Sequence, residues 1–191
     1  MGAGGEEVGR AVAERLGYLF VDEQLIASAA ERGGIDPGMV ADSERRKSIF
    51  AGLLDYLGEG GAAIVAAPVV SDDPPPEAIR ELIREAIAEV ASRGDAVIVA
   101  HAASFAVGAS ADVLRVLVTA PAETRAGRIE GASAEDALKK IKQSDVARGD
   151  YITRFYGVKQ ELPTHYDLVV NTDTLSTDSA AALIVAAAAG H

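Results

Sequence analysis

Four arginines in the last third of the chain are the side chains best suited to chemistry. Arg125 and Arg128 lie three residues apart, so a helix would present both on one face, and Arg148 and Arg154 follow on a second predicted helix. Guanidinium groups bind phosphate oxygens through paired hydrogen bonds, and phosphoryl transfer depends on such cations. The competing explanation is ordinary ion pairing with the nearby acids Glu123, Asp145 and Asp150.

A glycine-rich turn opens the chain and leads into a predicted helix from Val8 to Leu16. The turn consists of Gly2, Ala3, Gly4 and Gly5. Glycine lets the backbone approach a ligand closely, and the first N–H groups of the helix point back into the turn, as in phosphate-binding loops. Such a loop usually follows a hydrophobic strand and ends in Lys-Ser/Thr, whereas this chain has Glu6-Glu7 there. A phosphate cradle and the glycine-rich start of a frayed helix both fit.

Other candidate residues follow apolar runs or form a basic cluster. Asp22 and His101 each end an apolar run, so both would lie at the carboxyl ends of buried strands, where ligands of parallel sheets gather. Asp22 would hold a metal-bound water or cap the following helix. His101 would contact a phosphate or a base, or serve as a hydrogen-bonded structural residue. The run Arg45-Arg46-Lys47 is either a solvated helix face or an anion contact.

The pattern of apolar residues predicts the elements that position these side chains. Short apolar runs without alternation predict buried strands at 18–22, 96–100, 113–119 and 166–171. Helices are predicted at 8–16, 22–32, 39–58, 79–90, 121–130, 133–155 and after 177. Ser133 and Ser176 are expected to be N-caps of the last two helices. Strands that alternate with helices indicate an α/β protein with a mainly parallel sheet.

The composition is that of a globular chain with a large acidic excess. With 191 residues, of which 49% are apolar, we expect a single domain over residues 1–191. The net charge of -11 disfavours nucleic-acid binding, so a bound anion would need local cations. The absence of cysteine excludes disulfides and zinc–thiolate sites. Because no apolar run reaches about 18 residues, a cytoplasmic protein without a membrane partner is expected.

Several short motifs occur in a fixed order along the chain. They are the glycine turn with Val8-Gly9, Ala13–Gly17, Phe20–Ile26, Val97–Val99, Leu114–Val116, Pro121–Arg125, Asp145–Arg148, Tyr151, Tyr156-Gly157 and Tyr166–Thr172. The series resembles the cytidylate kinase-like family of P-loop proteins, over nearly the whole chain except about 49–76. The resemblance implies a three-layer α/β kinase fold with a five-stranded parallel sheet flanked by helices. It also implies a helical monophosphate-binding insertion at about 33–76 and an arginine-bearing lid at about 131–163.

The resemblance implies roles on the donor side. The glycine turn, with Gly2, Ala3, Gly4 and Gly5, matches the loop that holds the donor phosphates. Arg125 and Arg128 match the helix beside the nucleotide base, and Arg148 and Arg154 match lid positions that clamp the transferred phosphoryl group. Asp22 matches the acid after the second strand, close to Mg²⁺. The family's first strand would precede Met1. We therefore expect either that the protein begins upstream of Met1 or that its core is incomplete.

On the acceptor side the chain departs from the family pattern. Many members have Gly-Arg and then Ala-Asp after the third strand, where this chain has Ala100-His101 and Ala103-Ser104. His101 and Ser104, together with Arg45, are the residues that we expect to meet the acceptor. The cation and the acid expected to hold a monophosphate are replaced at these positions, which leaves the acceptor open.

The leading hypothesis is a nucleotide-binding phosphotransferase that uses ATP and Mg²⁺. It would transfer the γ-phosphoryl group to a nucleoside monophosphate or another small acceptor, by positioning and charge neutralisation and without a side-chain nucleophile. The alternative is a catalytically silent relative that binds a nucleotide or a protein partner as a regulatory module. Both hypotheses leave open whether the protein forms a homodimer.

Overall fold

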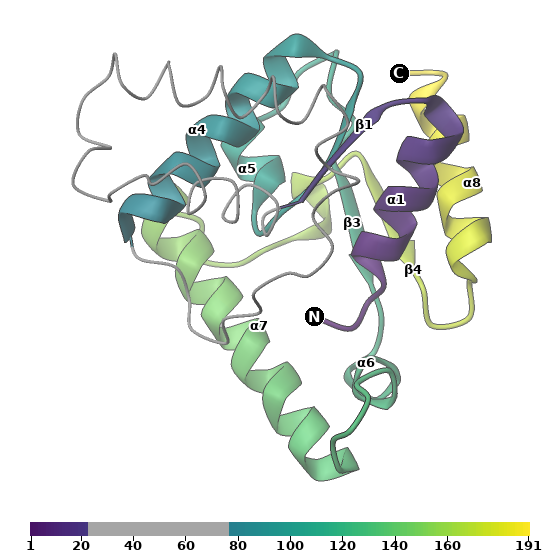
Figure 1. The fold of residues 1–191 in the computed structure, drawn as a ribbon. Helices are drawn as coiled ribbons and strands as arrows, with labels where there is room; N and C mark the ends of the chain where they lie inside the picture. Colours follow the sequence, from purple (N-terminus) through teal and green to yellow (C-terminus); the bar gives the residue numbers. More distant parts are fainter. Residues whose placement is uncertain (23–76) are drawn as a thin grey trace. The chain divides into compact units, whose positions relative to one another are not determined.

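The computed structural model describes residues 1–22 and 77–191, with the backbone alone for 77–83 (Figure 1). Contacts divide the chain into two compact units. The first comprises Met1–Gly17 and Val107–His191, and the second contains the described residues of Tyr18–Ala106. The described residues do not include the predicted helices between 23 and 58, the proposed insertion at about 33–76 or Arg45.

In the first unit, helix α1 (Gly5–Leu16) packs against helix α8 (Thr177–Ala188) (Figure 1). Each helix buries a stripe of small and branched residues at helical spacing: Val8, Val12 and Ala13 on α1, and Ala180, Ala181 and Ile184 on α8. The predicted helix stop at Gly17 is confirmed, because this glycine adopts the left-handed conformation after the last turn. The predicted N-cap Ser176 is also confirmed, since its hydroxyl accepts the Ser179 N–H at 3.2 Å.

Two parallel strands of the first unit are β3 (Val116–Thr119) and β4 (Leu168–Asn171), paired from Val116 with Leu168 to Thr119 with Asn171. Both begin later than predicted. An ion pair explains this: Arg115 donates to the Asp167 carboxylate at 2.7 Å and 3.0 Å, and its main-chain N–H donates to the same carboxylate at 2.8 Å. The side-chain pair therefore sets the register before the ladder begins.

The ion pair between Arg115 and Asp167 should make the stability of the folded protein depend on pH in the acid range. The Arg115 guanidinium, followed by the Arg115 main-chain N–H, lowers the pKa of Asp167 from 3.8 to about 2. A lowered folded-state pKa stabilises the protein above the unfolded value, and this contribution disappears as the pH falls from 3.8 towards 2. We expect the thermal midpoint of the Asp167→Asn variant to fall less than that of the wild type over this range. The midpoints are measured by thermal unfolding followed by circular dichroism. An equal fall of both midpoints with pH would contradict the assignment.

Helices α6 (Ala122–Gly127) and α7 (Ala134–Tyr156) pack through a small apolar cluster of Ala126, Ala137 and Ile141. The predicted cap Ser133 is confirmed, as its hydroxyl accepts the Asp136 N–H at 3.1 Å. Helix α6 ends at Gly127 and not at 130 as predicted. The backbone turns there through i to i+3 hydrogen bonds, and Ile129 packs against the cluster.

The second unit contains a parallel pair of strands, β1 (Leu19–Asp22) and β2 (Ala96–Val99), in register from Leu19 with Ala96 to Asp22 with Val99. Helix α4 (Glu77–Arg93) leads into β2, and the short helix α5 (Ala103–Val107) follows it, its last residue belonging to the first unit. Strands pair in parallel and alternate with helices, so the predicted α/β class is confirmed. No helix in the described ranges 1–22 and 77–191 is long and apolar enough to span a membrane.

Candidate functional site

The glycine turn before α1 has the backbone geometry of an anion-binding loop. Gly2 and Gly4 both have φ of 76°, in the left-handed region that favours glycine. Gly4 is the N-cap of α1 and offers no side chain to bind the first-turn N–H groups. The first N–H groups of a helix have no partner within the helix, so these donors are available to an anion.

The side chains of Arg128 and Thr172, which come much later in the sequence of the first unit, hold this turn. Arg128 donates to the Gly2 carbonyl at 3.2 Å and to the Thr172 hydroxyl at 3.1 Å, and it also donates to the Thr172 carbonyl at 2.5 Å. The Thr172 hydroxyl in turn donates to the Ala3 carbonyl at 2.7 Å. Thr172 is 3% exposed and follows β4 directly. The Gly2 and Ala3 carbonyl groups of the turn are thus held by hydrogen bonds from Arg128 and Thr172. Arg128 therefore contacts the backbone of the loop.

Arg125 lies against the same turn and forms an ion pair. Its guanidinium donates to both carboxylate oxygens of Asp145, at 2.8 Å and 2.7 Å. The hydrogen bonds and charge of this pair raise the pKa of Arg125 and lower that of Asp145. Asp145 is one of the acids named above as competing partners, so for Arg125 the ion pair is formed. The Arg125 Nε–H is buried without an acceptor among the described residues.

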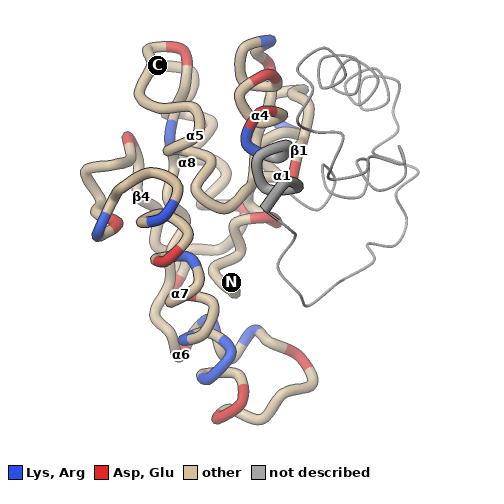
Figure 2. Tube along the Cα trace, turned by 90° about the vertical axis from the view of Figure 1, so that its left-hand side faces the viewer, with Lys and Arg blue, Asp and Glu red and all other residues tan. Residues whose placement is uncertain are grey.

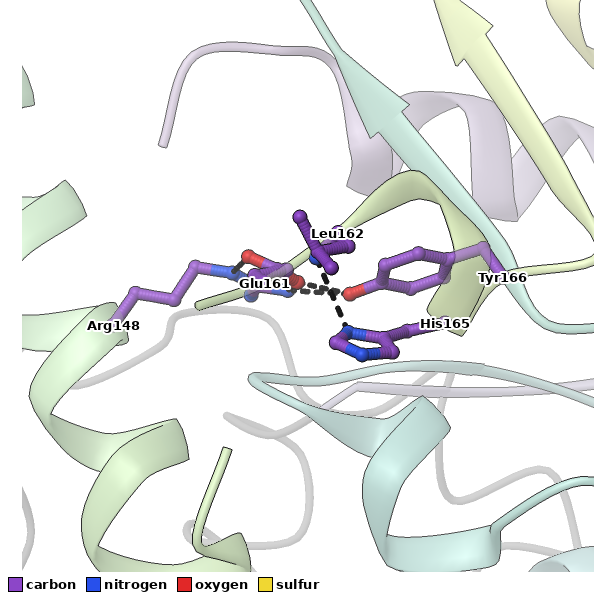
Figure 3. Close-up of polar contacts among 5 residues, drawn as sticks. All are labelled: Arg148, Glu161, Leu162, His165 and Tyr166. Atoms are coloured by element: carbon purple, nitrogen blue, oxygen red, sulfur yellow. Dashed lines mark hydrogen bonds and ion pairs between the residues drawn. The ribbon is translucent and has the colours of Figure 1, made fainter. Parts of the chain in front are cut away.

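Arg148 takes part in a second, half-buried network (Figure 3). From α7 it donates through Nε and Nη2 to the two carboxylate oxygens of Glu161, at 2.9 Å and 2.6 Å, and through Nη2 to the Tyr166 hydroxyl at 3.3 Å. The Tyr166 hydroxyl donates to the same carboxylate. Burial raises the pKa of Glu161, but the bonds from Arg148 and Tyr166 outweigh it and lower the pKa overall. The bond to Glu161 raises the pKa of Arg148.

The charges of Arg125 and Arg148 both act on the Met1 amino group at the start of the glycine turn. Burial, and next the charge of Arg125, lower the pKa of the Met1 amino group, while Asp145 raises it and Arg148 lowers it. Along α6 and α7, basic residues are interspersed with acidic ones (Figure 2). Arg125 and Arg148 are therefore the candidate local cations for an anion at the glycine turn.

Arg154 is not brought to the same place. It lies six residues after Arg148, about 240° further around the α7 axis. Its guanidinium carbon lies 5.5 Å from the ring centroid of Phe155. Arg148 and Arg154 therefore occupy different faces of one helix.

Asp22, His101 and Ser104 belong to the second unit. Asp22 is the last residue of β1, and His101 lies exposed in the turn after β2, so both follow the carboxyl ends of one parallel pair as predicted. Ser104 lies in α5. Their positions relative to the glycine turn stay a prediction. In the described part of the chain no group of three or more His, Asp or Glu residues could hold a metal. The role of Asp22 near Mg²⁺ stays a prediction.

Two functional candidates were missed from the sequence. Glu161 follows Arg148 by 13 residues, beyond the helix end at Gly157, where no helical spacing rule links the two. Thr172 belonged to a recognised motif, but its contact with Ala3 joins positions 169 residues apart. A threonine that directly follows a buried strand was the available signal for Thr172, whereas no sequence signal pointed to Glu161.

The chain is similar in sequence to a known family and to curated proteins. The model of the Cytidylate kinase-like family matches residues 1–174. The curated Cytidylate kinase of Pyrococcus horikoshii is 34% identical over 115 residues, which are 59% of this chain and 58% of that protein. The Cytidylate kinase of Ignicoccus hospitalis is 35% identical over 96 residues, 49% of this chain and 55% of that protein. The matched region thus spans less than two thirds of either relative.

A solved structure is similar to the whole chain in fold. The crystal structure of an uncharacterized protein from Eubacterium ventriosum has a TM-score of 0.68 with 14% sequence identity. The match covers 100% of this chain and 94% of that protein. At this identity the similarity concerns the fold alone.

Proposed function

Because the chain belongs to the cytidylate kinase-like family, we propose that it is a nucleotide-binding phosphotransferase that moves the γ-phosphoryl group of ATP to a nucleoside monophosphate or another small acceptor. One observation carries the proposal: a glycine turn at a helix N-terminus is fixed by Arg128 and Thr172, Arg125 lies against Gly2, and the charge of Arg148 acts on the Met1 amino group. N–H groups and arginines in this combination suit a polyphosphate.

The described residues would act by positioning and charge neutralisation. N–H groups of the glycine turn would bind the donor phosphates, and Arg128 with Thr172 would keep the turn in its binding conformation. Arg148 would stabilise the charge on the phosphoryl group during transfer. Asp22 is the residue that would hold magnesium through a water, and the ion would supply charge neutralisation.

Calorimetric titration of the purified chain with ATP and then with CMP, each with Mg²⁺, tests the proposal. Binding of both, followed by formation of ADP and CDP, is the expected result for a competent kinase. Binding of ATP alone would direct the search to a different acceptor. The absence of heat with either nucleotide would contradict nucleotide binding, and cytidine in place of CMP provides the control for contacts to the monophosphate.

A catalytically silent module is the second candidate, favoured by the charges around the turn. Glu6 and Glu7 occupy the first turn of α1, where they oppose a polyphosphate. Arg125 and Arg148 also have carboxylate partners already. ATP binding without product from any small acceptor would support this second function over the first.

Substitution of His101 by arginine should strengthen binding of CMP. The position corresponds to a cation in many family members, and an arginine there would supply paired hydrogen bonds to a monophosphate. We expect the Kd for CMP to fall by roughly tenfold, the gain of one charge-assisted contact. His101→Gln, which adds no charge, is the matched control. Equal CMP affinity of all three proteins in calorimetry would show that residue 101 does not face the acceptor.

A further inference from the structure

The contact between Arg148 and Glu161 has the geometry that a bound phosphoryl group would need. Two neighbouring guanidinium nitrogens, Nε and Nη2, each donate to a different carboxylate oxygen, at 2.9 Å and 2.6 Å. Paired donation of this kind is also how arginine binds two oxygens of a phosphate. Glu161 thus occupies the donors that the proposed function requires of Arg148.

The network around Glu161 can outlast the loss of Arg148. The Tyr166 hydroxyl donates to the Glu161 carboxylate independently of the arginine (Figure 3). Glu161 and Arg148 are also only half-buried, with side chains 22% and 28% exposed. A carboxylate that keeps one donor and has access to water loses less on release of the arginine than a fully buried partner would.

We propose that Glu161 is an internal competitor of the phosphoryl group: its carboxylate holds Nε and Nη2 of Arg148, and the pair must open before these two nitrogens can bind two phosphoryl oxygens. This inference rests on the proposed function. The pairing restrains Arg148 while substrate binds and makes its contact with phosphate depend on movement of the segment that carries Glu161. Glu161 is therefore a regulatory residue of the same site.

The test is MgATP binding by the Glu161→Gln variant, measured by calorimetry without an acceptor. Removing the competing charge should lower the Kd for MgATP by roughly tenfold, the effect of one charge-assisted contact. In the Glu161→Gln/Arg148→Ala double variant the gain should disappear. Asp167→Asn is the matched control, because it removes the same charge from another arginine pair of the same unit, with a side chain 29% exposed. Its Kd should stay within about twofold of the wild type.

The outcomes separate this inference from the proposed function. Wild-type binding of MgATP with an unchanged Kd in Glu161→Gln would overturn the inference and leave the function standing. A gain that persists without Arg148, or that Asp167→Asn shares, would also overturn it as a general charge effect. No binding by either protein would overturn both. If Glu161→Gln does not fold, Glu161→Asp keeps the charge with a shorter reach and should lower the Kd by about threefold; no change would overturn the inference.

Discussion

Replacement of Arg148 by alanine should lower kcat by roughly a thousandfold, the lower range for an arginine that neutralises a transferring phosphoryl group. The Kd for MgATP should change by less than about threefold, because Glu161 holds Arg148 in the ligand-free protein and little of its charge is used in binding. Steady-state kinetics and calorimetry on the same preparation measure the two effects. An unchanged kcat would remove Arg148 from the mechanism.

Two control variants test whether the loss of turnover is specific to Arg148. Arg148→Ala leaves Glu161 without its arginine, so the Arg148→Ala/Glu161→Gln double variant should recover thermal stability but not turnover. Arg154→Ala removes the same charge from another face of α7 and should reduce kcat much less. An equal loss in both single variants would place Arg154 in the mechanism beside Arg148.

Replacement of Gly2 by alanine should disrupt the glycine turn. A Cβ atom at Gly2 would lie 2.8 Å from the Arg125 carbonyl oxygen, closer than real Cβ contacts come, and 3.0 Å from the Arg125 Cβ. The residue also has φ of 76°, which costs alanine about 1 kcal/mol before any clash. We expect the free energy of unfolding to fall by about 2–3 kcal/mol and MgATP to bind at least about tenfold more weakly.

Gly17→Ala is the matched control for the turn. Gly17 also has a positive φ, of 69°, but a Cβ there would meet nothing within 4 Å. This variant therefore carries the backbone cost alone, about 1 kcal/mol, and should bind MgATP normally. Chemical denaturation and calorimetry compare the two variants. Equal stability and equal MgATP affinity of Gly2→Ala and Gly17→Ala would show that close packing on Arg125 plays no part.

Helices and their ends were predictable because their determinants are local. Ser133 and Ser176 cap α7 and α8 through residues three positions away, and Gly17 stops α1 through its own backbone conformation. Strand starts were less predictable. The apolar run from Val113 extends before β3, but the Arg115 pair with Asp167, 52 residues away, replaces the first part of the ladder.

The candidate site was predictable in its residue types and not in its pairings. The sequence indicates Arg125, Arg128 and Arg148 as local cations in an acidic chain, and the structure places Arg125 and Arg128 against the glycine turn. Arg128 reaches the Gly2 carbonyl, and Arg125 binds Asp145. Roles of Asp22, His101, Ser104 and Arg45 in binding stay predictions.

The amino-acid sequence by itself determined the α/β class and the family, because periodicity, caps and ordered motifs depend on neighbours along the chain. Tertiary structure alone decided that Glu161 holds Arg148 and that Thr172 holds Ala3. Both contacts join segments that meet only after strands and helices pack, 13 and 169 residues apart. The partner of a charged side chain is set by that packing, and so is the availability of each arginine to a phosphate.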